Sequence, residues 1–282
     1  MLTTHRRRLG MVLVLSGGLS VTAEAQVTRY VRYTAGGGAP AYGMLDGNTI
    51  RELSGDLFGS PRPTGRTVAL SEAKLLAPVV PSKVIAVGLN YRSHLGTTPP
   101  AAYPGLFAKM PTSIVGPDAE IVIPAGATNV HYEGELVVVI GRRAKNISAA
   151  DAAQYIFGVT AGNDVSERNW QQADLQWFRA KAADTFGPLG PVLVKGLNYN
   201  DLLLRTKLNG QVVQEQRTKD LLFDVHTIVS YISQFMTLEP GDVIYTGTPG
   251  STRAMKNGDT VEVEIEGVGV LRNKVVGPAG GE

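Results

Sequence analysis

Two glutamates at the start of an apolar run are the residues of this chain best suited to chemistry. In a strand, alternate side chains share a face, so His131, Glu133 and Glu135 would point the same way. Residues 136–140 are apolar on both faces, which is typical of a strand buried on both sides. Carboxylates beside a core need a cationic partner, because an unpaired buried charge is strongly unfavourable. A divalent metal would meet that need, and the alternative is a frayed segment with both glutamates in solvent.

A third carboxylate follows the next predicted strand. Residues 155–161 are apolar and lead into Gly162, Asn163 and Asp164, where irregular backbone can aim the Asp164 side chain. With three carboxylates, no cysteine and at most one histidine nearby, the site would be rich in oxygen ligands. Oxygen suits Mg²⁺, Mn²⁺ or Ca²⁺, whereas zinc favours cysteine or several histidines. We therefore expect Mg²⁺ or Mn²⁺, with Ca²⁺ as a further candidate.

Six sequence blocks, in a shared order, resemble the fumarylacetoacetate hydrolase family, in its acylpyruvase and 2-hydroxyhepta-2,4-diene-1,7-dioate isomerase-like branch. The resemblance extends over residues 79–276. The blocks are 83–91 with His94, 133–141 with its Glu-Gly-Glu start, 163–168, Lys181 before 186–191, 209–210 with Gln214, and 237–249.

The resemblance implies both a fold and a set of metal ligands. The fold would be mostly β with a few helices (α+β), a mixed β-roll or β-sandwich of the family's C-terminal type with a small N-terminal β-unit. The ligands would be Glu133, Glu135 and Asp164, and His131 would lie near the substrate without binding the metal. Such a site can chelate a 2-oxo acid and stabilise developing enolate charge.

The resemblance also implies residues for catalysis and substrate binding. Lys181 corresponds to the family's active-site lysine, which stabilises an enolate or acts as a base. Arg168 and Gln171 correspond to positions that orient the substrate, and Thr248 to a contact with its carboxylate.

Two departures from the family pattern affect specificity and water activation. Family hydrolases pair the histidine at position 94 with a glutamate three residues later, but here that residue is Thr97. A carboxylate partner orients an imidazole and strengthens it as a base, so His94 is a catalytic candidate without its usual support. Residues 250–253 also replace the usual glycine-rich continuation after Pro249. The loop 96–105 resembles a mobile cover over the site.

The leading interpretation is a divalent-metal-dependent hydrolase that cleaves a carbon–carbon bond in an acylpyruvate or related 2-oxo acid. A keto–enol isomerase or 2-oxo acid decarboxylase of the same family is the first alternative, because Thr97 weakens water activation. A non-catalytic, exported metal- or oxo-acid-binding protein is the second. The expected partner is a small oxo acid, and the resemblance implies a homodimer.

Composition and the first residues bear on localisation. The 282 residues are 43% hydrophobic and 18% charged, as in an ordinary globular protein. Residues 1–25 resemble a signal peptide, with arginines at 6–8, an apolar stretch at 9–21 and an Ala-Glu-Ala cleavage site. The pattern predicts export to a periplasm, by the Sec route in preference to the twin-arginine route, with no membrane attachment after processing. Without this segment the charges balance, and no basic run indicates nucleic-acid binding.

The remaining chain divides into a small N-terminal β-unit with its linker (26–80), a metal-dependent catalytic domain (81–277) and a disordered tail (278–282). A hairpin is expected at 43–50, with its turn at Asp46-Gly47. Helices are expected over 148–155, capped by Ser148, and over 225–236. Alternation at 261–266 predicts an edge hairpin with a solvated glutamate face.

Overall fold

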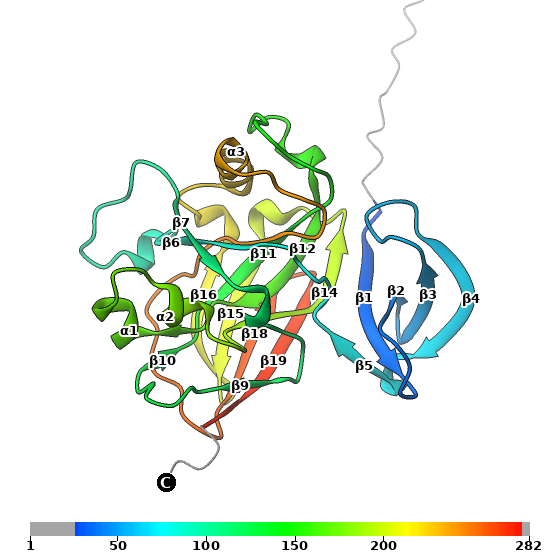
Figure 1. Cartoon of the computed structure of the whole chain (residues 1–282), viewed down its shortest axis with the longest axis horizontal. Coiled ribbons are helices and arrows are strands. Elements are labelled where there is room, and N and C mark those ends of the chain that lie inside the picture. The colour runs from blue at the N-terminus through cyan, green and yellow to red at the C-terminus, as the bar shows by residue number, and fades with distance from the viewer. Residues whose placement is uncertain (1–25, 278–282) are drawn as a thin grey trace, which may run out of the picture.

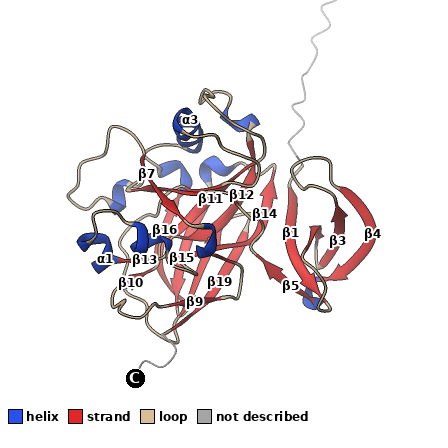
Figure 2. Ribbon diagram, viewed as in Figure 1, coloured by secondary structure: helices blue, strands red, loops and turns tan. Residues whose placement is uncertain are grey.

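The computed structural model describes residues 26–277, and this part of the chain is mostly β with three short α-helices (Figures 1 and 2). The predicted fold class is confirmed. The helices are α1 Arg168–Ala173, α2 Phe178–Ala182 and α3 Val225–Phe235. The strands are β1 Thr28–Ala35, β2 Ala41–Asp46, β3 Thr49–Ser54, β4 Arg62–Ala69, β5 Ala73–Leu76, β6 Val84–Gly88, β7 Gly105–Lys109, β8 Ile114–Val115, β9 Glu120–Val122, β10 Val130–His131, β11 Gly134–Ile140, β12 Ile156–Asn163, β13 Ser166–Glu167, β14 Gly187–Lys195, β15 Leu203–Leu208, β16 Gln211–Arg217, β17 Val243–Tyr245, β18 Thr260–Ile265 and β19 Gly269–Val276.

The largest sheet joins a small N-terminal unit to the main body. Its strand order is β4-β3-β2-β1-β14-β12-β11-β17-β6-β7, and β1 pairs antiparallel with β14. Strands β1–β5 form the smaller lobe at the right of Figure 1. The hairpin of β2 and β3, which turns at residues 47–48, confirms the predicted one.

Strand β11 lies at the centre of the main body and is buried along its whole length. It pairs with β12 on one side and β17 on the other, and β17 in turn pairs in parallel with β6. Leu136 and Val138 pack into one hydrophobic cluster, while Val137 and Val139 pack into another. The predicted strand with two apolar faces is therefore confirmed from residue 134 onward. His131 lies on the separate short strand β10, so the chain does not run as one strand from His131 to Ile140.

The predicted hairpin at 261–266 is confirmed, because β18 pairs antiparallel with β19, but its predicted place at a sheet edge is wrong. Strand β18 is the middle of a five-stranded sheet ordered β16-β15-β18-β19-β9, in which β9 and β19 pair in parallel. The two glutamates of β18 are half-buried, and Lys207 of the neighbouring strand β15 lies 2.8 Å from Glu264. Alternation alone predicts an exposed face but does not reveal how many strands flank it.

One predicted helix is confirmed and the other is not. Helix α3 is capped by Asp224, whose side chain accepts the backbone N–H of Thr227. Residues 148–155 instead form turns around a single 3₁₀ turn, Ala152–Gln154. The Ser148 hydroxyl does bond the N–H of Asp151, but only Ala152 in that turn is buried. Without an apolar face to bury, a short helix gains little from packing.

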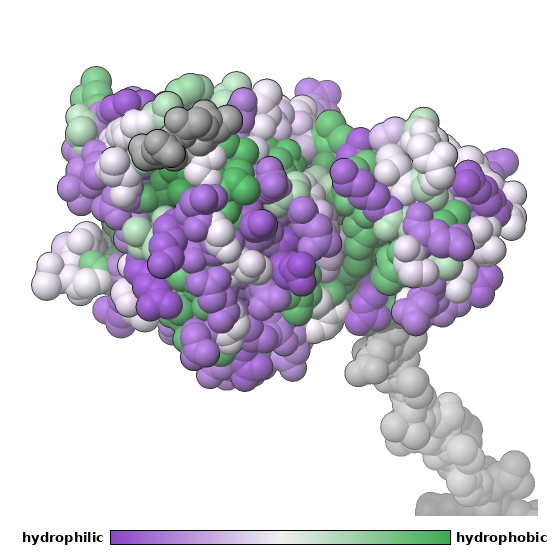
Figure 3. Space-filling view, turned by 90° about the horizontal axis from the view of Figure 1, so that it is seen from below, coloured by the Kyte–Doolittle hydropathy of each residue, from purple (hydrophilic) through white to green (hydrophobic). Residues whose placement is uncertain are grey.

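The elements that border the site lie on one side of the main body. The loop between β6 and β7 and the helices α1 and α2 occupy the left side of Figure 1, and α2 packs against β7. The face seen in Figure 3 is mostly polar, and apolar residues gather in the seam between the main body and the smaller lobe. Among residues 26–277, no helix is long and apolar enough to cross a membrane.

Candidate active site

The three predicted ligands come together in the buried interior. Glu133, Glu135 and Asp164 are each at most 4% exposed, and one oxygen of each lies within 4.8 Å of the others. Their positions follow from the pairing of β11 with β12, which sets Gly134 opposite Asn163 and Glu135 opposite Gly162. Asp164 follows directly after β12, and its N–H bonds the carbonyl of Glu133 at 2.8 Å. The two strands therefore present their three carboxylates to one point.

Gly134, between the two glutamates, is held by two side chains. The Thr248 hydroxyl donates to its carbonyl at 2.9 Å, and Gln214 accepts its N–H at 3.2 Å. A Cβ at position 134 would lie 2.0 Å from Oγ1 of Thr206, so only glycine lets β11 approach β15 this closely. Thr248 borders the site, but its one O–H donor is already used. A substrate carboxylate could accept a hydrogen bond from the Thr248 hydroxyl only if the hydroxyl gave up its hydrogen bond to the Gly134 carbonyl.

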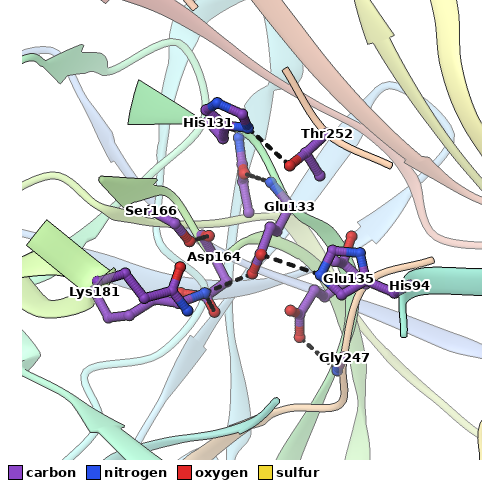
Figure 4. A network of polar contacts seen from close by, with 12 residues as sticks. His94, His131, Glu133, Glu135, Asp164, Ser166, Lys181, Gly247 and Thr252 are labelled. Atoms are coloured by element: carbon purple, nitrogen blue, oxygen red, sulfur yellow. Dashed lines mark hydrogen bonds and ion pairs between the residues drawn. The ribbon is translucent and has the colours of Figure 1, made fainter. Parts of the chain in front are cut away.

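Two buried lysines bind the carboxylates, and only one of them was predicted. Nζ of Lys181, on α2, lies 2.6 Å from Glu133 and 2.7 Å from Asp164 (Figure 4). Nζ of Lys109, the last residue of β7, lies 2.6 Å from the other Asp164 oxygen and also donates to the backbone carbonyl of Lys181. Lys109 was missed because a lysine ending a short strand is ordinarily solvated. Its place after an apolar segment, Leu-Phe-Ala, was the available signal.

Burial and neighbouring charges set the protonation of these groups. Burial lowers the pKa of Lys109, and the nearby Lys181 adds to this effect against the opposing influence of Asp164. Burial also opposes the charged form of Lys181, but Asp164 and Glu133 outweigh it and raise the pKa of this lysine. Burial would raise the pKa of Glu133, yet Lys181 and Arg168 hold it well below its ordinary value.

Glu135 is the carboxylate without a cation. Burial, followed by repulsion from Asp164 and Glu133, raises the pKa of Glu135 well above its ordinary value. Its carboxylate accepts the backbone N–H of Gly247 at 2.7 Å, and among residues 26–277 it forms no salt bridge. The arrangement therefore leaves one carboxylate in need of positive charge. This need and the hard oxygen donors fit a divalent metal such as Mg²⁺ or Mn²⁺.

The predicted substrate-orienting residues lie side by side. Arg168 begins α1 and bonds Glu133, the Gln171 side chain at 2.8 Å and the Thr252 hydroxyl at 2.9 Å. The buried Glu167 caps α1 and so positions Arg168. Arg168 and Gln171 both line the small cavity in front of the carboxylates.

His94 also lines this cavity, and its orienting partner is not a carboxylate. Nδ1 of His94 bonds the carbonyl of Gly250, which can only accept, so Nδ1 carries the hydrogen. Nε2 then faces the site, 3.6 Å from Glu133. Thr97 is exposed on the following loop. The unusual segment 250–253 thus supplies the imidazole with a neutral backbone partner.

His131 stands apart from the acidic group. One ring nitrogen bonds Thr252 at 2.9 Å (Figure 4), and the other bonds Asn129 at 2.8 Å. Burial, reinforced by Arg168, lowers the pKa of His131 to about 4, so the ring is neutral at pH 7. Both nitrogens are used within the protein, which leaves neither free for a metal.

Comparison with known proteins identifies the family. The description "Fumarylacetoacetate (FAA) hydrolase C-terminal" matches residues 83–276, and "Rv2993c-like, N-terminal" matches residues 28–78. The chain belongs to the fumarylacetoacetate hydrolase family. Protein Rv2993c of Mycobacterium tuberculosis is 47% identical over 249 residues, which cover 84% of this chain and 94% of that protein.

Two further relatives carry names that describe an activity. The human protein named oxaloacetate tautomerase FAHD2A, mitochondrial, is 42% identical over 221 residues. These residues cover 73% of this chain and 70% of the human protein. The crystal structure of 2-hydroxyhepta-2,4-diene-1,7-dioate isomerase from Mycobacterium marinum superposes with a TM-score of 0.84 at 46% identity. The superposed region covers 89% of this chain and 99% of the isomerase chain. Two of these relatives are thus enzymes by name, one a tautomerase and the other an isomerase.

The predicted export is wrong. The human relative is by name a mitochondrial enzyme. An arginine cluster before an apolar stretch is a compositional pattern, which is not specific to exported proteins. Residues 1–25, on which that prediction rested, and the predicted tail 278–282 lie outside the described residues.

Proposed function

We propose that this protein is a divalent-metal-dependent isomerase that interconverts the keto and enol forms of a 2-oxo acid. The names of the human tautomerase and the mycobacterial isomerase support this activity. In the reaction a C–H bond next to the carbonyl breaks and an O–H bond forms on the carbonyl oxygen, so substrate and product are isomers. No water molecule is consumed.

The observation that carries the proposal is the partner of His94. A backbone carbonyl, that of Gly250, orients the ring. A neutral carbonyl fixes the tautomer but strengthens the base less than a carboxylate would. Among the described residues, the acidic group within 4 Å of His94 is Glu133, which already binds Arg168 and Lys181. Such a histidine suits transfer of a proton from carbon better than activation of water for hydrolysis.

The other residues have roles that follow from their charges. Arg168 and Gln171 line the cavity and would hold the substrate carboxylate. Lys181 has a raised pKa, so at neutral pH its ammonium would stabilise negative charge on the enolate oxygen. Nε2 of His94 would take up and return the proton. A divalent metal bound by Glu133, Glu135 and Asp164 would supply Lewis-acid polarisation of the carbonyl.

Hydrolysis of an acylpyruvate is the second candidate, because Nε2 of His94 also faces the cavity where water could enter. The deciding experiment uses purified protein with Mg²⁺ or Mn²⁺, and with EDTA as the control. Ketonisation of enol-oxaloacetate is followed by ultraviolet absorbance, and acylpyruvate products by NMR. We expect metal-dependent ketonisation that is faster than hydrolysis. Rapid acylpyruvate cleavage without ketonisation would overturn the proposal.

A further inference from the structure

The cavity in front of the carboxylates is too small to hold a whole substrate. Its volume is about 30 Å³, which is room for about one water molecule. A second cavity of about 340 Å³ adjoins it, and the two share Gly88, Leu89 and Trp177 as lining residues. Small-molecule sites commonly enclose 300 Å³ or more. The larger cavity therefore supplies the space that the polar one lacks.

The larger cavity is apolar. None of its nine lining residues carries a charge: they are Gly88, Leu89, Ala101, Gly105, Leu106, Phe107, Leu175, Gln176 and Trp177. Arg168 and Lys181 line the small polar cavity instead. A carboxylate in the larger cavity would lose hydration without gaining a cation, which is unfavourable. An alkyl or aryl group would bury apolar surface there.

Two aromatic rings connect the larger cavity to the reacting end. Nζ of Lys181 lies 5.0 Å from the centre of the Phe107 ring. The ring of Trp177 meets that of Phe107 edge-on, with centres 5.5 Å apart. One wall therefore continues from the active-site ammonium into the apolar space.

The junction between the cavities depends on Gly88. A Cβ at this position would lie 3.2 Å from Trp177 and 3.6 Å from Phe107, so a larger side chain would narrow the passage. The neighbouring Leu89 has a φ of 57°, which a leucine rarely adopts. This backbone brings a 40% exposed leucine to the wall of both cavities.

The outer rim of the cavity leaves apolar surface uncovered. Leu175 is 96% exposed, and Ala101 contributes from the loop between β6 and β7. That loop, predicted as a cover, thus borders the apolar cavity. A bound apolar group would bury part of this surface.

We propose that the larger cavity receives an uncharged apolar or aromatic group at the far end of the 2-oxo acid, so that this protein prefers aryl or alkyl 2-oxo acids to dicarboxylates. The inference rests on the proposed function, which supplies the orientation of the 2-oxo acid end toward Lys181. The preference for an apolar group distinguishes this protein from enzymes whose substrate, like oxaloacetate, carries a second carboxylate.

Phenylpyruvate and oxaloacetate form a matched pair of probes, because they share the 2-oxo acid end and differ in the group attached to it. With Mn²⁺ present, kcat/KM for keto–enol interconversion should favour phenylpyruvate by about tenfold or more. Gly88→Val and Ala101→Trp should each lower that ratio about tenfold by filling the cavity. Ala101 lies on an exposed loop, so its variant tests the idea even if Gly88→Val fails to fold. Val212→Ser, an exposed aliphatic control outside both cavities, should leave the ratio unchanged.

Calorimetric binding of both acids to the Mn²⁺-loaded protein separates failure of this inference from failure of the proposed function. Tighter phenylpyruvate binding that Ala101→Trp abolishes would support the apolar subsite even if neither acid were interconverted. Faster turnover and tighter binding of oxaloacetate would overturn the subsite while leaving the isomerase intact. The subsite would also be overturned if both cavity variants kept the preference for phenylpyruvate, or if the Mn²⁺-loaded protein bound neither acid.

Discussion

The buried Lys109 and Asp164 form an ion pair at 2.6 Å, with both side chains at most 1% exposed. The same ammonium donates to the backbone carbonyl of Lys181. One strand-end lysine therefore fixes both a predicted metal ligand and the segment that carries the active-site lysine. Its role is to position those groups.

Lys109→Met should destabilise the fold by about 3–5 kcal/mol, because it leaves Asp164 with one fewer cation and a carbonyl without its donor. Chemical denaturation at pH 7 measures this change. Lys219→Met removes an exposed partner of Asp201 and should cost less than about 1 kcal/mol. Equal losses from both variants would show that Lys109 does not hold the site together.

Glu135→Gln should abolish metal binding and activity together, since it removes a ligand charge. Without metal, the variant should be more stable than wild type at pH 7. The pKa of Glu135 is raised in the fold, so folding favours its neutral form, and stability falls as pH rises from the ordinary value of about 4.3 toward the folded pKa. Calorimetry with Mn²⁺ and melting in EDTA across pH test both parts. Stoichiometric metal retained by the Glu133→Gln/Glu135→Gln double variant would refute the ligand assignment.

Lys181→Met should lower keto–enol interconversion by about 10²–10³-fold, because an enolate oxygen would lose its stabilising ammonium. Metal affinity should not fall, since the change removes a cation that binds Glu133 and Asp164. Steady-state kinetics and Mn²⁺ calorimetry on the same preparations separate the two effects. Parallel loss of metal and activity would mean that the lysine acts by organising the carboxylates.

Thr97→Glu should raise acylpyruvate hydrolysis without changing metal binding or ketonisation. Thr97 is exposed three residues after His94, and a carboxylate there could replace the neutral Gly250 carbonyl as the orienting partner. General-base assistance is typically worth about 10²–10⁴-fold, so partial restoration is measurable by NMR. Thr97→Gln matches the size without the charge and should have no effect. A wild-type protein that already hydrolyses acylpyruvates rapidly would show that Thr97 is no handicap.

Asp224→Ala should destabilise the protein by about 1 kcal/mol at pH 7, because the cap of α3 accepts the Thr227 N–H at 2.7 Å. Partial burial would raise the pKa of Asp224, but the hydrogen bonds from Thr227 and the nearby His226 together outweigh burial and lower the pKa. The stabilisation is therefore complete above the ordinary pKa of about 3.9 and is lost as pH falls through the folded value. Urea titrations should show the variant and wild type converging in acid, while Asp224→Asn stays close to wild type at neutral pH. A gap that is constant with pH would contradict this account.

The sequence predicted the acidic group because its geometry is local. Glu133 and Glu135 stand at the start of one strand and Asp164 at the end of the next, and alternation with antiparallel pairing is enough to bring them together. The apolar stripe of α3 and its length were predictable for the same reason.

Contacts between distant segments could not be predicted in this way. The partner of His94 is a backbone carbonyl 156 positions away, and no side-chain pattern encodes it. Lys109 meets Asp164, 55 positions further along the chain, and the carbonyl of Lys181 on α2 only through the tertiary fold, in which β7 packs against α2. The central place of β18 likewise depends on β15, a strand outside its own hairpin.

Two of the three parallel pairings, β6 with β17 and β9 with β19, determine when the protein can fold. Strand β6 must wait for β17, and β9 for β19, so each of the two larger sheets needs a strand from the last part of the chain. Such long-range pairings make folding slow and leave strand edges open meanwhile. On a ribosome, β11 emerges with Glu135, and with Glu133 directly before it, but without its neighbour β17. A nascent chain that stops before β17 therefore carries all three acidic residues and still lacks the sheet that holds them in place.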